Sequence, residues 1–224
     1  DLAIQYYHGK CIKQDIEKAI YYFQIVAKEN PGALNYLGLI YKYHLKRKEK
    51  EYLIYFHEAA IRNDVDAMIN LANYYIYESG IKNDVNKAID YLKRASNLGN
   101  SQSQFMLASI YYNGKYGIKK DIQKGIIFYQ LSADNRYTES QFVVGYLYHK
   151  GENLKRNIKK SIHYYKEASN KNNSFAKNNL GIIYKYGFGN EVLPNLNLAI
   201  EYFTDVIKLK NVVALYNLVH LYFF

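Results

Sequence analysis

Tyrosine recurs along this chain at a nearly constant interval, and this repetition constrains the fold more than any other feature. The recurring residues stand at positions 6, 41, 75, 111, 148, 184 and 222, in steps of 34 to 38 residues. A period of roughly 20 to 50 residues is typical of proteins that stack copies of one small structural unit. The sequence therefore predicts a single repeat array over 1–224.

Each copy opens with a small residue, three variable positions, an apolar residue, a second small residue, two more positions and an aromatic residue. These offsets share one face of an α-helix. The second small residue stands mid-helix, where glycine costs about 1 kcal/mol relative to alanine, so we expect two helices to approach closely there. The tyrosine three positions later is expected to fill space beside the next repeat. The signature pairs are Gly38 and Tyr41, Ala72 and Tyr75, Ala108 and Tyr111, Gly145 and Tyr148, and Gly181 and Tyr184.

A second helical pattern follows in each copy, headed by Asp or Asn. A side-chain oxygen at this place caps the free amides in the first turn of a helix. In the second copy Lys48 replaces the capping residue. The expected caps are Asp15, Asp84, Asp121, Asn157 and Asn195. Between the two patterns stand glycines, where a helix must stop: Gly9, Gly80, Gly114, Gly151 and Gly187.

Two helices per copy make each repeat a helical hairpin, and such hairpins bury their apolar face by stacking into a solenoid. We predict an all-α solenoid of about six antiparallel helix pairs, without strands. The approximate repeats are 1–31, 32–65, 66–101, 102–138, 139–174 and 175–212, with a partial copy at 213–224. Both ends stand inside a first helix, so we expect this chain to be a segment of a longer protein.

Together the two patterns resemble the Sel1-like repeat family, a group of tetratricopeptide-like α-solenoids. The best matches are Asp15-Ile16-Glu17-Lys18-Ala19 and the segment from Gly80 to Ala88. The resemblance covers nearly the whole chain and departs from the family pattern at Lys48 to Tyr52 and at Val219. It implies a right-handed superhelix whose concave face, lined mainly by first helices, binds partners.

The resemblance also implies a scaffold that assembles other proteins. In eukaryotes the best-known role of the family is in endoplasmic-reticulum-associated degradation, where the solenoid presents misfolded glycoproteins to a membrane ubiquitin ligase. It therefore implies a location in the endoplasmic reticulum, with a ligase and misfolded proteins as partners; a cytosolic or regulatory scaffold is the alternative. The sequence Asn172-Asn173-Ser174 is a glycosylation acceptor compatible with that lumen. With one cysteine, Cys11, the chain differs from disulfide-stapled bacterial relatives.

Nothing in the sequence predicts catalysis, a cofactor or a metal site. There is no Gly-x4-Gly-Lys-Ser/Thr phosphate loop, and Gly187-Phe188-Gly189 lacks the third glycine of a dinucleotide site. The histidines include no pair at metal-ligand spacing with a carboxylate. His8, His44 and His149 stand near the ends of first helices, where a cation favours the helix C-terminus. We therefore predict a protein that is not an enzyme and has no small-molecule substrate.

Function is expected on the first helices, beside the stripe that faces the core. Positions +3 and +6, counted from the small residue that opens the motif, vary in type among repeats. Asparagine suits an extended peptide because its amide both donates and accepts hydrogen bonds, and apolar residues suit a partner helix. Replacing Asn70 and Asn179 by alanine is expected to weaken partner capture and leave the melting curve intact. The candidate partner-binding residues are Tyr36, Asn70, Asn73, Met106, Tyr146, Asn179 and Asn217.

The chain is basic, with 30 Lys and Arg against 20 Asp and Glu and a net charge of +10. Such a balance favours nucleic acid, an anionic membrane surface or acidic partners, although codon bias in an AT-rich genome explains the same composition. RNA is the alternative partner of a different class, but a code of one base per repeat needs constant spacing. The lysine runs at 46–48, 119–120 and 155–160 are expected to be solvated. No apolar run reaches the roughly 20 residues of a membrane-spanning helix.

Overall fold

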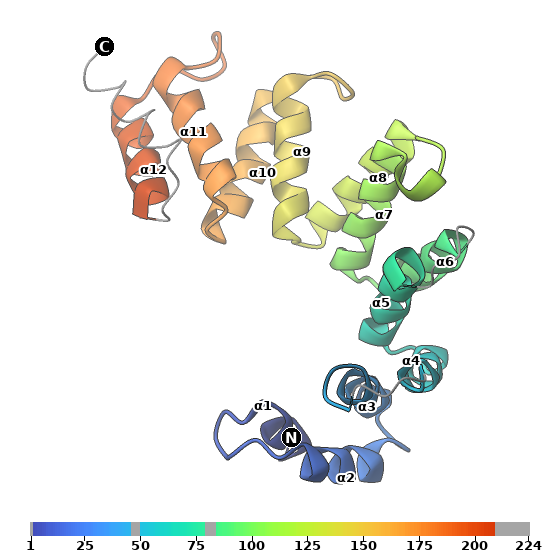
Figure 1. Ribbon diagram of the computed structural model, residues 1–224. Coiled ribbons are helices and arrows are strands. Elements are labelled where there is room, and N and C mark those ends of the chain that lie inside the picture. The colour runs from blue at the N-terminus through green and yellow to red at the C-terminus, as the bar shows by residue number, and fades with distance from the viewer. Residues whose placement is uncertain (1, 46–49, 79–83, 209–224) are drawn as a thin grey trace. The chain divides into compact units, whose positions relative to one another are not determined.

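The computed structural model describes residues 2–45, 50–78 and 84–208. Within these ranges it contains twelve α-helices and no β-strand, which confirms the predicted all-α class (Figure 1). The chain divides into two compact units, residues 1–103 and 104–224, which are described separately.

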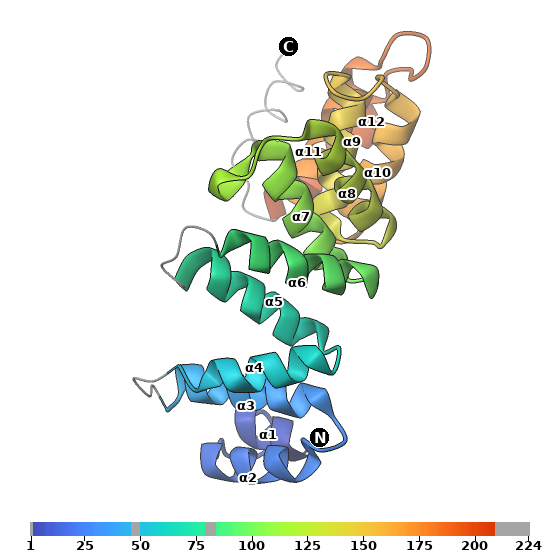
Figure 2. The same cartoon turned by 90° about the vertical axis from the view of Figure 1, so that its right-hand side faces the viewer.

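Residues 1–103 contain three successive helical hairpins, and the paired helices lie side by side (Figure 2). A π-helical turn, η1, continues the first helix of the third hairpin. The elements are α1 (Leu2–His8), α2 (Ile16–Val26), α3 (Pro31–Tyr43), α4 (Tyr52–Ile61), α5 (Val65–Asn73), η1 (Tyr74–Glu78) and α6 (Val85–Asn97).

The second unit repeats the hairpin three more times, beginning within the helix that spans the boundary between the units. A short 3₁₀ turn, η2, lies in the loop of its first hairpin. The elements are α7 (Ser101–Asn113), η2 (Lys115–Gly117), α8 (Ile122–Asp134), α9 (Thr138–Lys150), α10 (Ile158–Asn170), α11 (Ser174–Tyr186) and α12 (Leu196–Lys208).

The predicted caps tie the second helix of a repeat to the first. Asp121 Oδ1 accepts a hydrogen bond from Lys124 N at 2.9 Å, and Asp121 N donates to Tyr111 O at 2.8 Å. Asp84 differs, because its side chain makes no capping bond and its carboxylate pairs with Lys87 Nζ at 3.0 Å. The same two bonds as at Asp121 are made by Asp15, Asn157 and Asn195.

The mid-helix glycines lie where a ring of the second helix presses on the first helix, which confirms the expected close approach. A Cβ added at Gly38 would stand 2.5 Å from Phe56 Cε1, nearer than real Cβ contacts. Gly145 has this relation to Tyr165, and Gly181 to Phe203. Each of these three rings is buried. Glycine is therefore needed at these positions to make room for an aromatic residue.

The recurring tyrosines stack on a ring of their own hairpin, a contact that the sequence did not predict. They also meet a neighbouring repeat, since Tyr148 Oη accepts a hydrogen bond from Gln130 Nε2 of α8 at 3.0 Å, so the expectation of packing between repeats was incomplete. Tyr148 and Tyr164 show the geometry, with ring centroids 6.1 Å apart and planes 8° from parallel. The stacking arises because both rings stand at the loop end of their helices and face each other across the pair. The equivalent stacked pairs are Tyr6 and Tyr22, Tyr75 and Tyr91, Tyr111 and Phe128, and Tyr184 and Tyr202. In the second repeat Tyr41 and Tyr55 meet at a tilt of 46°.

The predicted loop glycines Gly9, Gly114, Gly151 and Gly187 have positive φ angles. Gly151, for example, ends α9 with φ 75°, a conformation that glycine adopts without strain. Gly80, Lys48, the candidate Asn217 and the partial copy at 213–224 lie outside the described residues.

Candidate partner-binding surface

The candidate residues at positions +3 and +6 lie at the surface of the first helices. In the described part of the chain all of them are half-buried except Tyr146, which is exposed. They are therefore accessible to a partner. The half-buried residues are Tyr36, Asn70, Asn73, Met106 and Asn179.

Two of the asparagines already bond within the protein. Asn70 Nδ2 donates to Oδ1 of the buried Asn35 at 2.9 Å, and Asn179 Nδ2 donates to Tyr165 Oη at 3.0 Å. Removing either amide would leave a buried polar group without its partner, which costs about 1–3 kcal/mol. The structure therefore changes the expectation for Asn70→Ala and Asn179→Ala, because both changes should lower the melting temperature.

An exposed aromatic patch lies on the first helices of residues 104–208. We define it as Phe142 and Tyr146 of α9 together with Phe175 of α11. The Phe142 ring centroid lies 6.5 Å from that of Tyr146 and 5.7 Å from that of Phe175. Tyr146 is 41% exposed and Phe175 is 63% exposed. Of the three, the sequence predicted only Tyr146, because Phe142 and Phe175 stand at +2 and −1 of their motifs.

Residues 1–103 hold their candidate aromatic residue differently. Tyr36 stacks on Phe23, with centroids 4.9 Å apart and planes 6° from parallel, and meets Tyr7 edge-on at 5.6 Å. With Tyr22 and Phe23 it lines a small apolar hollow of about 200 Å³ between the first hairpin and α3. Tyr36 therefore serves packing between hairpins.

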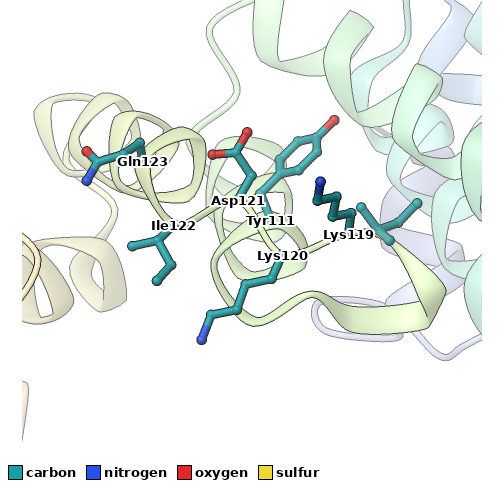
Figure 3. Close-up of a pocket in the computed structure, with 7 residues that line it drawn as sticks. Tyr111, Lys119, Lys120, Asp121, Ile122 and Gln123 are labelled. Carbon is teal, nitrogen blue, oxygen red and sulfur yellow. The ribbon is translucent and has the colours of Figure 1, made fainter.

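A basic edge lies where the loops α7–α8 and α9–α10 meet. Asn153 of the second loop donates from Nδ2 to Tyr112 Oη at 3.0 Å, which joins this loop to the C-terminal end of α7, where the first loop begins. An open hollow of about 670 Å³ lies at this edge, and its lining includes Tyr111, Ile118, Asp121 and Ile122. Lys119 and Lys120 point from its loop in different directions (Figure 3). We define the basic edge as Lys115, Lys119, Lys120, Lys124, Lys150, Lys155, Arg156, Lys159 and Lys160.

The histidines of the described residues lie beside aromatic rings. His57 Nδ1 lies 3.0 Å from Tyr91 Oη, and its Nε2 lies 3.4 Å from Tyr75 Oη. Burial, aided by the charge of Lys87, lowers the pKa of His57. Burial also lowers the pKa of His149, with Lys150 and Arg156 adding to the effect. His149 therefore favours the neutral ring, contrary to the expectation of a cation at that helix end.

Neither a metal site nor a membrane span is found in the part of the chain that the structure describes. No group of three or more His, Cys, Asp or Glu side chains there lies close enough to hold a metal ion. None of the described helices combines the length and the apolar character that crossing a bilayer requires.

The family model described as "Sel1 repeat" matches residues 1–30, 65–100, 101–137, 138–173 and 174–204, well over half of the chain. The internal interval that it leaves out, residues 31–64, is occupied by the α3–α4 hairpin, where Lys48 stands in place of the cap. No curated protein sequence matches the chain.

Among solved structures, a Sel1 repeat protein from Oxalobacter formigenes is similar over 92% of this chain and 85% of its own, with 27% sequence identity and a TM-score of 0.78. A protective antigen of uropathogenic Escherichia coli with an SLR fold is 21% identical, with a TM-score of 0.58, over 99% of this chain and 56% of its own. An immunity protein from Pseudomonas aeruginosa is 17% identical, with a TM-score of 0.57, over 93% of this chain and 81% of its own. The last two show the fold alone.

Proposed function

The chain belongs to the Sel1 repeat family, and we propose that it is a scaffold that binds other proteins and has no enzymatic activity of its own. Solenoids of this family are in general scaffolds for protein interactions. Their stacked hairpins offer an extended surface of first-helix side chains, and this surface suits a protein chain better than a small molecule.

The observation that carries the proposal is the aromatic patch. Contiguous exposed apolar side chains on a soluble protein mark interaction sites, whereas single exposed apolar residues are common. Aromatic side chains are also enriched among the few interface residues that supply most of the binding energy. We therefore assign partner binding mainly to the first helices α9 and α11, with Tyr146 and Phe175 as anchors.

Affinity capture from cross-linked cells tests this assignment when the native chain is compared with a Tyr146→Ser/Phe175→Ser variant. The matched control is Tyr21→Ser/Tyr43→Ser, which removes two aromatic side chains that are 61% and 57% exposed in residues 1–103. We expect the patch variant to lose its main partner and the control to keep it. Equal retention by both variants, with unchanged melting curves, would contradict the assignment.

The narrower proposal, an adaptor that presents misfolded proteins to a ubiquitin ligase of the endoplasmic reticulum, is supported only by the resemblance to the family. It stays a prediction, as do that location and the alternative of a cytosolic or regulatory scaffold. The same affinity-capture experiment distinguishes the degradation adaptor from the cytosolic or regulatory scaffold. A membrane ubiquitin ligase with lumenal chaperones would support the adaptor, whereas a cytosolic assembly without them would support the alternative.

RNA binding is the proposal of a different class, and the excess of basic residues is its support. Retention on RNA that falls steeply as salt rises would favour it. The described aromatic rings at the loop ends argue against single-stranded RNA, because they stack on one another in pairs.

A further inference from the structure

Positive charge is concentrated in the second unit. Residues 104–224 contain 16 of the 30 Lys and Arg residues but only eight of the 20 Asp and Glu residues, a net charge of +8. Residues 1–103 contain the other 14 basic and 12 acidic residues, a net charge of +2. A composition bias spread over the whole gene does not explain this asymmetry.

Most of the excess charge of the second unit lies on the basic edge. Its two segments, 114–124 and 150–160, contain nine Lys and Arg residues and two acidic residues, Asp121 and Glu152. All nine cations are exposed except Lys124, which is half-buried. The corresponding loop of the last described hairpin has no Lys or Arg between Gly187 and Leu196. Within the second unit the excess charge is therefore concentrated in these two loops.

The cations of the basic edge are not neutralised within the described residues. In residues 1–103, the lysine three positions after the cap pairs with that cap: Lys18 with Asp15 at 3.5 Å, and Lys87 with Asp84 at 3.0 Å. In residues 104–208 the two described ion pairs both involve Asp205, far from the edge in sequence. The equivalent Lys124 instead lies over the Tyr111 ring, 4.1 Å from its centroid.

The capping residue near Lys160 shows why a lysine of the basic edge lacks an ion pair. There the cap is Asn157, which accepts the first-turn hydrogen bond as an aspartate would but carries no charge. Lys160 consequently has no carboxylate beside it and lies over the Tyr148 ring at 5.2 Å. The nine cations of the basic edge repel one another, and a negatively charged partner reduces that repulsion.

We propose that the basic edge binds an acidic segment of a partner protein, one rich in Asp and Glu side chains. The inference rests on the proposed scaffold function and adds the chemistry of the partner. The hollow at this edge offers such a segment apolar and cationic contacts together, because its lining comprises Tyr111, Ile118, Ile122, Lys119 and Lys120 beside Asp121 and Gln123. An extended or helical peptide fits this arrangement of apolar and cationic groups.

Three observations favour a polypeptide over the other polyanions. Eight of the nine cations are lysines, whereas arginine is the residue favoured for bidentate phosphate recognition. Tyr111 and Tyr148 are only 8% and 9% exposed, so they offer no free ring face for a nucleic-acid base to stack on. Ile118 and Ile122, which line the hollow, are half-buried, so they present no projecting apolar side chain for insertion into a bilayer.

The test measures binding of a fluorescein-labelled oligoglutamate peptide to the whole chain by fluorescence anisotropy. The edge variant is Lys119→Glu/Lys120→Glu/Lys159→Glu/Lys160→Glu. Its matched control is Lys10→Glu/Lys13→Glu/Lys28→Glu/Lys93→Glu, which reverses four exposed lysines in residues 1–103 and gives the same net charge. Circular dichroism melting curves show whether each variant folds.

We expect the edge variant to bind the peptide at least about tenfold more weakly than the native chain, and the control to lose less than about threefold. Equal losses in both variants, or no binding of the peptide by the native chain, would overturn the proposal. Tighter, edge-dependent binding of oligouridylate or of phosphatidylserine vesicles would overturn it in favour of RNA or of a membrane surface.

The Tyr146→Ser/Phe175→Ser variant separates this proposal from the proposed function. It should bind oligoglutamate nearly as the native chain does, because it keeps all nine cations and, of the rings beside them, removes only the one that lies 5.7 Å from Lys150 Nζ. If the aromatic patch proves necessary for partner capture while oligoglutamate does not bind, the scaffold function stands and the acidic partner is rejected.

Discussion

Residues 1–103 and 104–208 fold into the same hairpins but occupy one buried position of the first helix in opposite ways. This is position +1, directly after the small residue that opens the motif. The first unit places Leu34 and Met68 there, both buried and apolar. The second unit places Gln104, Gln141 and Lys177 there, which are equally buried and polar.

The polar residues of the second unit need partners, and the structure supplies most of them. Gln104 Oε1 accepts from Asn135 Nδ2 at 2.9 Å, and Lys177 Nζ lies 3.2 Å from Asp205 Oδ2. Gln141 Oε1 has no hydrogen-bond partner among the described residues. The difference teaches that the signature residues determine the hairpin, while the positions between them are free to carry local polar networks and surface chemistry.

The largest effect is expected when the polar residue that the second unit has at position +1 is introduced at this position in the first unit. Met68→Gln would bury an amide in the third repeat, where Leu98 stands at the place of Asn135 and offers no side-chain hydrogen bond. We expect a loss of about 3 kcal/mol in the free energy of unfolding. Urea denaturation measures it. The control Gln141→Met, which removes the unpaired acceptor, should be neutral or stabilising, and an unchanged midpoint for Met68→Gln would break the comparison.

The second effect concerns the contacts between successive second helices. Arg62 donates from Nη1 to Ala27 O at 2.6 Å and from Nη2 to Lys28 O at 2.7 Å, at the C-terminal end of α2. In the second unit, Lys171 makes one such contact, to Arg136 O. We expect Arg62→Ala to cost about 2 kcal/mol.

Lys171→Ala is the matched variant for this contact, and because Lys171 is exposed we expect it to cost less than about 1 kcal/mol. Thermal melting of both variants gives the two losses of stability to be compared. A larger loss for Lys171→Ala than for Arg62→Ala would mean that the two units do not differ here as the contacts indicate.

A third test asks whether the shared part of the hairpin is equivalent in both units. Gly38→Ala and Gly145→Ala would each push a Cβ against a buried ring, Phe56 and Tyr165 respectively. Crowding costs about 1–3 kcal/mol and the better helix propensity of alanine returns about 1 kcal/mol, so we expect a net loss of up to about 2 kcal/mol for each. Denaturation curves that show a loss in only one variant would contradict the equivalence.

The smallest effect is a dependence on pH that both units share. Burial lowers the pKa of His57 in the first unit and of His149 in the second from the ordinary value of 6.5. The unfolded chain therefore binds more protons, and stability should fall as the pH drops below about 6.5. In the His57→Gln variant, melting followed from pH 7.5 to about 5 should show a shallower loss. An equally steep loss of stability in the variant would show that His57 does not contribute to the pH dependence.

The sequence predicted those parts of the molecule that repeat. The spacing of Tyr148 and Gly145 recurs in each copy, because every hairpin must make the same internal contacts. It therefore identified the helix pairs, the caps and the close approaches of the glycines. The stacking partner of each tyrosine was missed, since periodicity gives a face of a helix but not which neighbour that face meets.

The candidate surface was predicted only in part, for physical reasons. The amide of Asn70 suits a partner's backbone and the side chain of Asn35 equally well, and only three-dimensional structure shows that the internal bond is made. Phe175 stands outside the motif positions, so no periodic signal marked it. The charge difference between the halves was readable from the sequence, but the unpaired state of Lys160 depended on the position of its ring and cap.

The most direct test of the account is photocrosslinking to the partner recovered in the capture experiment. A photoreactive phenylalanine analogue is placed at Tyr146 on α9 and, separately, at Asn73 on α5, which stands at the same +6 position in the first unit. The account predicts a covalent adduct from position 146 and little or none from position 73. Adducts from position 73 alone would contradict the central claim that the first helices of the second unit bind the partner.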